Sequence, residues 1–389
     1  MKINWQAIVK SKASVLFQWY VFEGHKEHYF EKSLGIDAGL RNEKIVDGEI
    51  FIDPTEWAKL KETLAKKIES DPNFLNTFIE GCYKYGKALL KTSKDSATSA
   101  SNKSLLKLYK RYQGAVLDLM PFLNATLALD SVLQTKISET FRQELGISDQ
   151  KELELLLSKL IIPKKKSFFV LEQENLLEMA LELEKDSEAN IEQKIEKHQK
   201  EYGWMPCVAY LGDFKSEKEI RKEVQELVEE NPQEKLNQKQ KLQKEKEQNF
   251  KKDWEEIESS KQTKNLVNQA RKFLYLMQYR LDIFFKSYFE AYPLFQELAR
   301  KWGVTPHDVV HLTGPEIISL LENKKSFPEK EVKKRQDEYA LVKIDNEIKI
   351  YSGEDVEKEQ EERKEAIIVK GQIANRGRGQ GAVRLVFGT

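Results

Sequence analysis

The chain has 389 residues, and Lys plus Arg and Asp plus Glu both number 64, so its formal net charge is zero at pH 7. This balance argues against a general attraction to nucleic acid or to an anionic membrane. Hydrophobic residues amount to 40%, enough for a substantial core in two or three domains. The two cysteines are far apart and lack CxxC spacing, which argues against a disulfide framework or a structural zinc module.

The start of the chain and its longest apolar runs predict a cytoplasmic protein. Residues 1–5 (MKINW) contain no apolar segment of the kind that a signal peptide needs. No window reaches the roughly 18 apolar residues that span a bilayer. We therefore expect no contact with a membrane.

Residues 1–190 are predicted to form a helical region with one small hairpin. Asp47-Gly48 lies between two apolar runs and predicts a tight turn, because both turn positions need positive φ. Asp53-Pro54-Thr55-Glu56 predicts a helix start in which the Glu56 carboxylate reaches back to the cap amide. The apolar run from Leu105 to Leu145 predicts helix with a kink or break at Pro121, and Ser167–Leu171 is predicted as a strand.

Residues 191–338 are predicted to form a second helical domain that carries a charged arm. The arm, residues 217–264, is almost entirely Glu, Lys and Gln and follows the capping-box pattern Ser216 to Glu219. It lacks the apolar heptads of a coiled coil. Leu266–Ala291 then predicts a long helix with a broad aromatic face.

In residues 339–389 the apolar residues recur with a period of two, which predicts strands. Asp345-Asn346 lies between apolar runs and predicts a hairpin, and a glycine-rich turn separates Ile367–Val369 from Val383–Val386. Gly377–Gly381 has the composition of a phosphate-binding loop or an RGG segment. It leads into a strand and does not repeat, so a turn is favoured and nucleic-acid binding is not expected. The predicted fold is mainly α: an irregular multi-helix domain with short β-hairpins and a truncated β-rich C-terminal segment.

The sequence contains few candidates for catalysis. No nucleophile-elbow, P-loop, zinc-protease or kinase motif appears, so we predict that the chain has no complete catalytic site. His25 and His28 are three residues apart and could share a metal ion. No third ligand is identifiable, so a solvated surface pair is favoured.

Three other side chains allow either a structural or a binding role. Trp204 lies in an aromatic turn that either lines a pocket or fills the core, and the core is favoured. Arg271 and Arg280 lie on the long aromatic helix, where each charge needs a partner. A carboxylate such as Glu290 or Glu297 is favoured over an anionic ligand.

The later part of the chain resembles a known enzyme family. Residues 202–204 and four other motifs are similar to the helical region of phosphoenolpyruvate-utilising enzymes. These enzymes are of the pyruvate, water dikinase (phosphoenolpyruvate synthase) type and include the rifampicin phosphotransferase branch. The four motifs are Phe295–Gly303, Asp308–Thr313, Pro315–Ile317 and Val332–Tyr339. The resemblance covers residues 265–389 and, more sparsely, 195–215.

The closing residues resemble the entry strand of that family's swivelling phosphohistidine domain. They run from Val369 to Asn375 and from Gly381 to Val386, with Asn375-Arg376 where Ser-Pro is common in the family. In such enzymes ATP phosphorylates a mobile histidine, which then carries the phosphoryl group to an acceptor. None of the five histidines has the family's Gly-Gly-x-x-Ser-His-Ala context, and the ATP-grasp domain has no counterpart.

The resemblance therefore implies a component or fragment of a dikinase-like phosphotransferase, contributing the acceptor-side helical domain. ATP and Mg would be bound by the complete enzyme and not by this chain alone, and a separate ATP-grasp or phosphohistidine protein is an expected partner. The acceptor is a small molecule: pyruvate, an antibiotic hydroxyl or another alcohol. The substrate-binding candidates are Trp204, Arg271, Tyr275, Arg280 and Arg335. The alternative is a non-catalytic interaction protein whose working surface is the charged arm.

Overall fold

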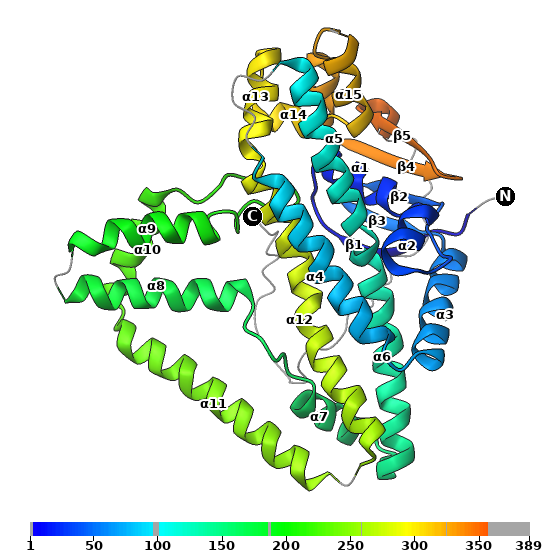
Figure 1. Cartoon of the computed structure of the whole chain (residues 1–389), viewed down its shortest axis with the longest axis vertical. Helices are drawn as coiled ribbons and strands as arrows, with labels where there is room; N and C mark the ends of the chain where they lie inside the picture. Colours follow the sequence, from blue (N-terminus) through cyan, green and yellow to red (C-terminus); the bar gives the residue numbers. More distant parts are fainter. Residues whose placement is uncertain (1–2, 96–100, 186–187, 258, 324, 357–389) are drawn as a thin grey trace.

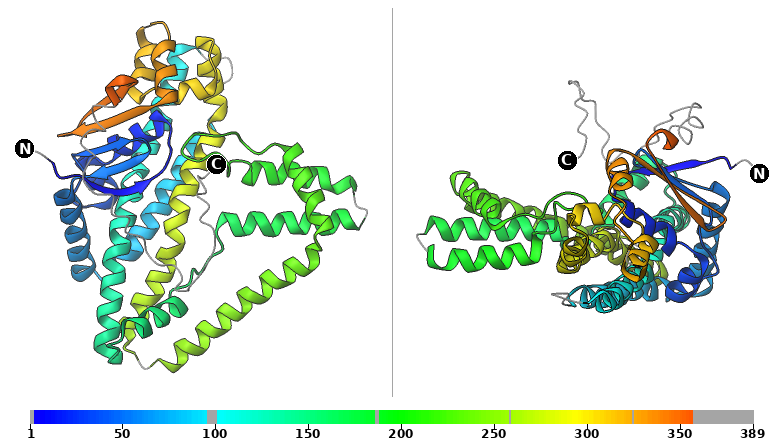
Figure 2. Two further views of the ribbon diagram at one scale, coloured as in Figure 1. Left: turned by 180° about the vertical axis from the view of Figure 1, so that it is seen from behind. Right: turned by 90° about the horizontal axis from the view of Figure 1, so that it is seen from above.

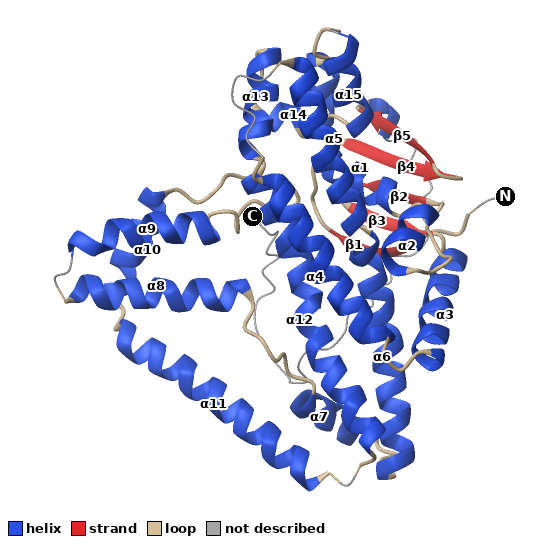
Figure 3. Cartoon of the chain, in the orientation of Figure 1, coloured by secondary structure: helices blue, strands red, loops and turns tan. Residues whose placement is uncertain are grey.

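A computed structural model describes residues 3–95, 101–185, 188–257, 259–323 and 325–356. These residues form sixteen helices and one five-stranded antiparallel sheet (Figures 1 and 3), so the mainly α prediction is confirmed. The β-rich segment predicted near the C-terminus, including Ile367–Val369 and Val383–Val386, lies outside the described residues.

The bounds of the strands are β1 (Gln6–Lys10), β2 (Glu43–Val46), β3 (Glu49–Ile52), β4 (Tyr339–Ile344) and β5 (Glu347–Ser352). The bounds of the first eight helices are α1 (Val15–Gly24), α2 (Glu27–Leu34), α3 (Pro54–Ser70), α4 (Phe74–Ser93), α5 (Asn102–Leu119), α6 (Pro121–Leu145), α7 (Gln150–Leu160) and α8 (Phe168–Glu184). The bounds of the remaining helices are α9 (Glu188–Tyr202), α10 (Glu217–Glu229), α11 (Pro232–Glu256), α12 (Lys261–Glu290), α13 (Tyr292–Trp302), α14 (Pro306–Val309), α15 (Gly314–Asn323) and α16 (Glu329–Asp337).

The sheet joins the two ends of the described chain. Its strand order is β1-β3-β2-β4-β5, and β2 pairs with β4 in the register Glu43↔Lys343. Both predicted hairpins are confirmed, because Asp47-Gly48 and Asp345-Asn346 all adopt positive φ. Strands β4 and β5, from the unit predicted for residues 339–389, therefore share one sheet with β1, β2 and β3, from the unit predicted for residues 1–190.

Helices α4, α5, α6 and α12 form a long bundle beside the sheet (Figure 1). The break predicted at Pro121 is confirmed, since α5 ends at Leu119 and α6 begins at the proline. One apolar stretch of the described residues, within Asn102–Leu145, is long enough to cross a membrane by length and composition alone. In the fold, 72% of this apolar window is buried, and a buried core helix passes the same test of length and composition.

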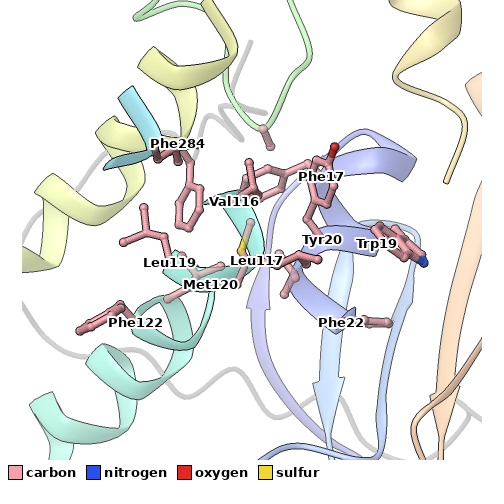
Figure 4. Packing of buried hydrophobic residues seen from close by; sticks show 14 of the residues in the cluster. Phe17, Trp19, Tyr20, Phe22, Val116, Leu117, Leu119, Met120, Phe122 and Phe284 are labelled. Atoms are coloured by element: carbon pink, nitrogen blue, oxygen red, sulfur yellow. The ribbon is translucent and has the colours of Figure 1, made fainter. Parts of the chain in front are cut away.

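Aromatic side chains from α1 and α12 pack with aliphatic side chains from α5 in the main core (Figure 4). The Phe17 ring lies edge-on to Phe284, with ring centroids 6.0 Å apart, and edge-on to Tyr210 at 5.2 Å. Such edge-to-face pairs stabilise a core beyond the area that they bury. The core therefore joins the N-terminal α1 to the much later α12.

Helices α8, α9 and α10 project from the bundle as a unit that we call the three-helix projection, and α11 runs from its far end back to the base (Figures 1 and 2). The charged arm predicted for residues 217–264 thus contains α10 and α11. The three-helix projection has its own small core, which includes Leu176, Ile195 and Ile220. The strand predicted at Ser167–Leu171 is wrong. Ser167 caps α8 by accepting a hydrogen bond from the Val170 amide, and the following Leu, Met and Glu residues favour helix.

Of the two reciprocal helix caps predicted from the sequence, the structure confirms one. The capping box at Ser216 is confirmed, with both reciprocal hydrogen bonds to Glu219 present. The reciprocal cap predicted for Glu56 is wrong, although Asp53 does cap α3. The Glu56 carboxylate instead accepts hydrogen bonds from the amides of Arg41 and Asn42 at 2.8 and 3.0 Å, because the fold brings that loop over the helix start.

Candidate functional site

Two helices and one loop surround a cavity of about 290 Å³, which we call the Tyr–Lys cavity. One face of α4 forms the first wall, because its lining residues are spaced by three and four positions. One turn of α12 forms the second wall, and the loop between α7 and α8 forms the third. The lining residues are Asn76, Ile79, Glu80, Tyr83, Lys164, Lys165, Lys272 and Tyr275.

Three tyrosine rings cluster at this cavity. The Tyr83 and Tyr275 centroids are 6.5 Å apart, and Tyr279 supports Tyr83 from 4.8 Å in an edge-on contact. Partial burial raises the pKa of Tyr83 to about 12, and burial likewise raises the pKa of Tyr275. Both phenols are therefore neutral at physiological pH, and both ring faces keep the electron density that attracts a cation.

Positive charge dominates the lining. The ammonium groups of Lys164, Lys165 and Lys272 are exposed and form no ion pair with a side chain of the described residues. The Lys165 Nζ lies 5.0 Å from the Tyr83 centroid and 5.6 Å from that of Tyr275. Desolvation lowers the pKa of Lys164, and the positive charges of Arg271 and Lys272 lower it further. An anion in the cavity would relieve this repulsion.

Of the predicted binding residues, Tyr275 lines the cavity and Arg271 lies beside it. The Arg271 side chain turns away from the cavity. Its Nε donates a hydrogen bond to the Ile162 carbonyl at 3.0 Å, and its Cζ lies 3.5 Å from the Phe250 centroid. Arg271 thus holds the end of α11 and the start of the α7–α8 loop against α12.

Arg280 is buried in the bundle and does not reach the cavity. Its Nε donates to the Leu123 carbonyl at 3.1 Å, and desolvation lowers its pKa to about 10. The predicted carboxylate partners are wrong, because Glu290 lies by Lys94 and Glu297 pairs with Arg300. A backbone carbonyl accepts the Nε hydrogen bond of Arg280 instead, while its Nη1 is buried without a hydrogen-bond partner among the described residues. No sequence pattern predicts this arrangement.

Trp204 and Arg335 also lie away from the cavity. The core position favoured for Trp204 is confirmed: it is buried, and its Nε1 donates to the Glu201 carbonyl at 2.8 Å. Arg335 is 4% exposed and makes a bidentate pair with Glu316 at 2.8 and 2.9 Å. Both side chains hold the fold together, since their donors are already used within it.

The surface pair favoured for His25 and His28 is wrong. His25 is fully buried, with its Nδ1 2.8 Å from Glu43 Oε1, whereas His28 is exposed. Lys343 Nζ lies 2.6 Å from the other oxygen of Glu43, and all three side chains are inaccessible to solvent. Within the part of the chain that the structure describes, no three His, Cys, Asp or Glu side chains are arranged to hold a metal ion.

A larger hollow of about 640 Å³ lies beside α2, and its lining carries more negative charge than that of the Tyr–Lys cavity. A hydrogen bond between Glu27 and Asp37 raises the pKa of Glu27, which indicates two carboxyl groups in close approach. Glu31 and Lys26 also line this hollow. Because its charge is mainly negative, the hollow suits a phosphate group less well than the Tyr–Lys cavity does.

Sequence reasoning missed most of the cavity. A weak signal exists in Pro163-Lys164-Lys165-Lys166, a lysine run at a helix boundary, and in Lys272, one turn before Tyr275. Nothing local indicates that Tyr83 would face these residues, because the pairing of α4 with α12 is a long-range contact.

Comparison with known proteins identifies no family for this chain. No family model matches the chain, and no curated protein matches it. The resemblance to phosphoenolpyruvate-utilising enzymes therefore stays a prediction made from the motifs.

Proposed function

We propose that this chain is the acceptor-side helical component of a dikinase-like phosphotransferase, with the Tyr–Lys cavity as its acceptor pocket. The observation that carries the proposal is the set of three lysines around a cavity floored by Tyr83 and Tyr275. The ATP-binding and phosphohistidine functions would come from other residues or from a separate protein. The family motifs at Phe295–Gly303 and Val332–Tyr339 support the same assignment.

Transfer from a phosphohistidine to an alcohol makes clear demands on an acceptor pocket. The N–P bond breaks, an O–P bond forms and the hydroxyl proton leaves, so a doubly charged phosphate ester results. Lysine ammonium groups stabilise such charge through charge-assisted hydrogen bonds. Lys164, Lys165 and Lys272 supply them here, and Glu80 supplies a carboxylate in the lining that can accept the hydroxyl proton.

Binding of simple phosphate compounds tests this proposal. We expect the full chain to bind phosphoenolpyruvate and inorganic phosphate in calorimetry, and Lys164→Gln with Lys272→Gln to weaken binding about tenfold or more. The matched control is Lys222→Gln with Lys241→Gln, two exposed lysines on α10 and α11. Absence of phosphate binding, or equal losses in both double variants, would rule the proposal out.

The alternative is a non-catalytic interaction protein that uses the charged arm. It is favoured by one observation: Leu242 is 57% exposed on α11, a helix whose other exposed residues are all polar or charged. Under this alternative Leu242→Asp abolishes partner capture, whereas the two cavity lysine substitutions leave it unchanged.

A further inference from the structure

We infer that the Tyr–Lys cavity recognises a phosphate ester whose organic part is a planar aromatic ring, either an aryl phosphate or a nucleoside monophosphate. This inference rests on the proposed function and names the class of ligand for the same pocket. It follows from where the ring faces lie, how far apart they are and how the charges are placed around them.

The faces of two tyrosine rings are open to the cavity. The ammonium group of Lys165 lies over both Tyr83 and Tyr275, at 5.0 and 5.6 Å from their centroids. A ligand ring that stacks there takes the place of this ammonium. The displaced Lys165 is then free to pair with the anionic end of the same ligand, so ring and phosphate are bound together.

The spacing of the tyrosines determines how a ring can bind. Stacked aromatic centroids need separations of about 4.5 Å or more, so a ring between two others needs about 9 Å. Tyr83 and Tyr275 are 6.5 Å apart and tilted by 41°. The ligand ring therefore lies across their shared face and is not inserted between them.

The positive charge of Lys272 lies beside this aromatic floor. Lys272 is one turn before Tyr275 on α12, so side chains from these positions emerge about 5–6 Å apart. Lys272 Nζ donates to Asn76 Oδ1 at 3.4 Å, which places its charge at the α4 wall. A ring and a phosphate joined by a short linker match this separation. The cavity volume, about 290 Å³, suits a single small ring system more than a large polycyclic compound.

Calorimetry with four phosphate compounds tests the inference on the full chain. The probes are inorganic phosphate, ethyl phosphate, phenyl phosphate and adenosine monophosphate. We expect phenyl phosphate or adenosine monophosphate to bind at least about tenfold more tightly than ethyl phosphate. The tighter of the two aromatic probes distinguishes an aryl phosphate from a nucleotide.

Two substitutions separate ring recognition from charge recognition. Tyr275→Leu should reduce the aromatic preference to about threefold or less while inorganic phosphate still binds, and Tyr275→Phe should keep the preference. Tyr85→Leu is the matched control, because Tyr85 lies on α4 but packs against Phe122, outside the cavity lining.

The outcomes distinguish this inference from the proposed function. Equal affinity for ethyl and aromatic phosphates would overturn the inference and leave the proposed phosphate pocket standing. An aromatic preference that survives Tyr275→Leu would place the ring elsewhere and also overturn it. If no phosphate compound binds, the inference and the proposed function fail together.

Discussion

The buried cluster of His25, Glu43 and Lys343 predicts a large and coupled effect on stability. Glu43 lies 2.8 Å from His25 Nδ1 and 2.6 Å from Lys343 Nζ, and none of the three side chains is exposed. Burial alone would raise the pKa of Glu43, but the charges of His25 and Lys343 hold it below its ordinary value. Glu43→Gln removes the counter-charge and leaves the Lys343 ammonium buried. We expect a loss of about 3–5 kcal/mol in the free energy of unfolding.

Urea unfolding of a double-mutant cycle checks this magnitude. The variants are Glu43→Gln, Lys343→Met and the two combined, each followed by tryptophan fluorescence and circular dichroism to confirm a single transition. Lys343 also donates to the Phe22 carbonyl at 2.6 Å, so its replacement loses that bond as well. The combined variant should lose at least about 2 kcal/mol less than the sum of the single losses. Additive losses within about 0.5 kcal/mol would refute an energetic coupling between the two strands.

Three further predictions follow from buried groups. Burial lowers the pKa of His311 from 6.5 to about 4. The folded state therefore binds a proton at His311 less readily than the unfolded state does. The stability that neutral His311 contributes above its ordinary pKa of 6.5 is lost as the pH falls toward its folded-state pKa of about 4. Between pH 7 and pH 5 we expect a loss of about 2 kcal/mol in urea unfolding, which His311→Gln should largely remove. Gly314→Ala would place its Cβ 2.7 Å from Cη2 of Trp19, so thermal unfolding should reveal a loss of about 1–3 kcal/mol. Cys82 and Cys207 are buried with pKa values raised to about 12, so a thiol reagent at mildly alkaline pH should label both in urea and neither in the native protein.

Turns and helix starts could be predicted because their determinants are local. Asp47-Gly48 and Asp345-Asn346 adopt the positive φ that their composition favours, and Ser216 forms the expected capping box. Ser167 shows the limit of such reasoning. Its short run of Phe, Val and Leu has strand propensity, yet the cap and the longer helical pattern that follows determine the outcome.

Long-range contacts could not be predicted in the same way. His25 looks like a surface residue in a charged segment, and its partners Glu43 and Lys343 come from two strands that only the sheet brings together. Arg271 and Arg280 were correctly expected to need partners, but backbone carbonyls serve where carboxylates were predicted. Whether a backbone carbonyl becomes the partner depends on tertiary packing, and the types of the surrounding residues do not indicate it.

The charged arm and the wall of the Tyr–Lys cavity share contacts through Arg271, which bears on both candidate functions. The carbonyl of Ile162, in the loop that carries Lys164 and Lys165, accepts the Arg271 hydrogen bond, and this loop leads directly into α8 of the three-helix projection. Arg271 also stacks on Phe250 near the end of α11, so α11 and the cavity wall share one anchor. We therefore expect a displacement of α11 to shift the loop that carries Lys164 and Lys165. On this geometry a partner that binds the charged arm would alter phosphate affinity, so the two functions need not be exclusive.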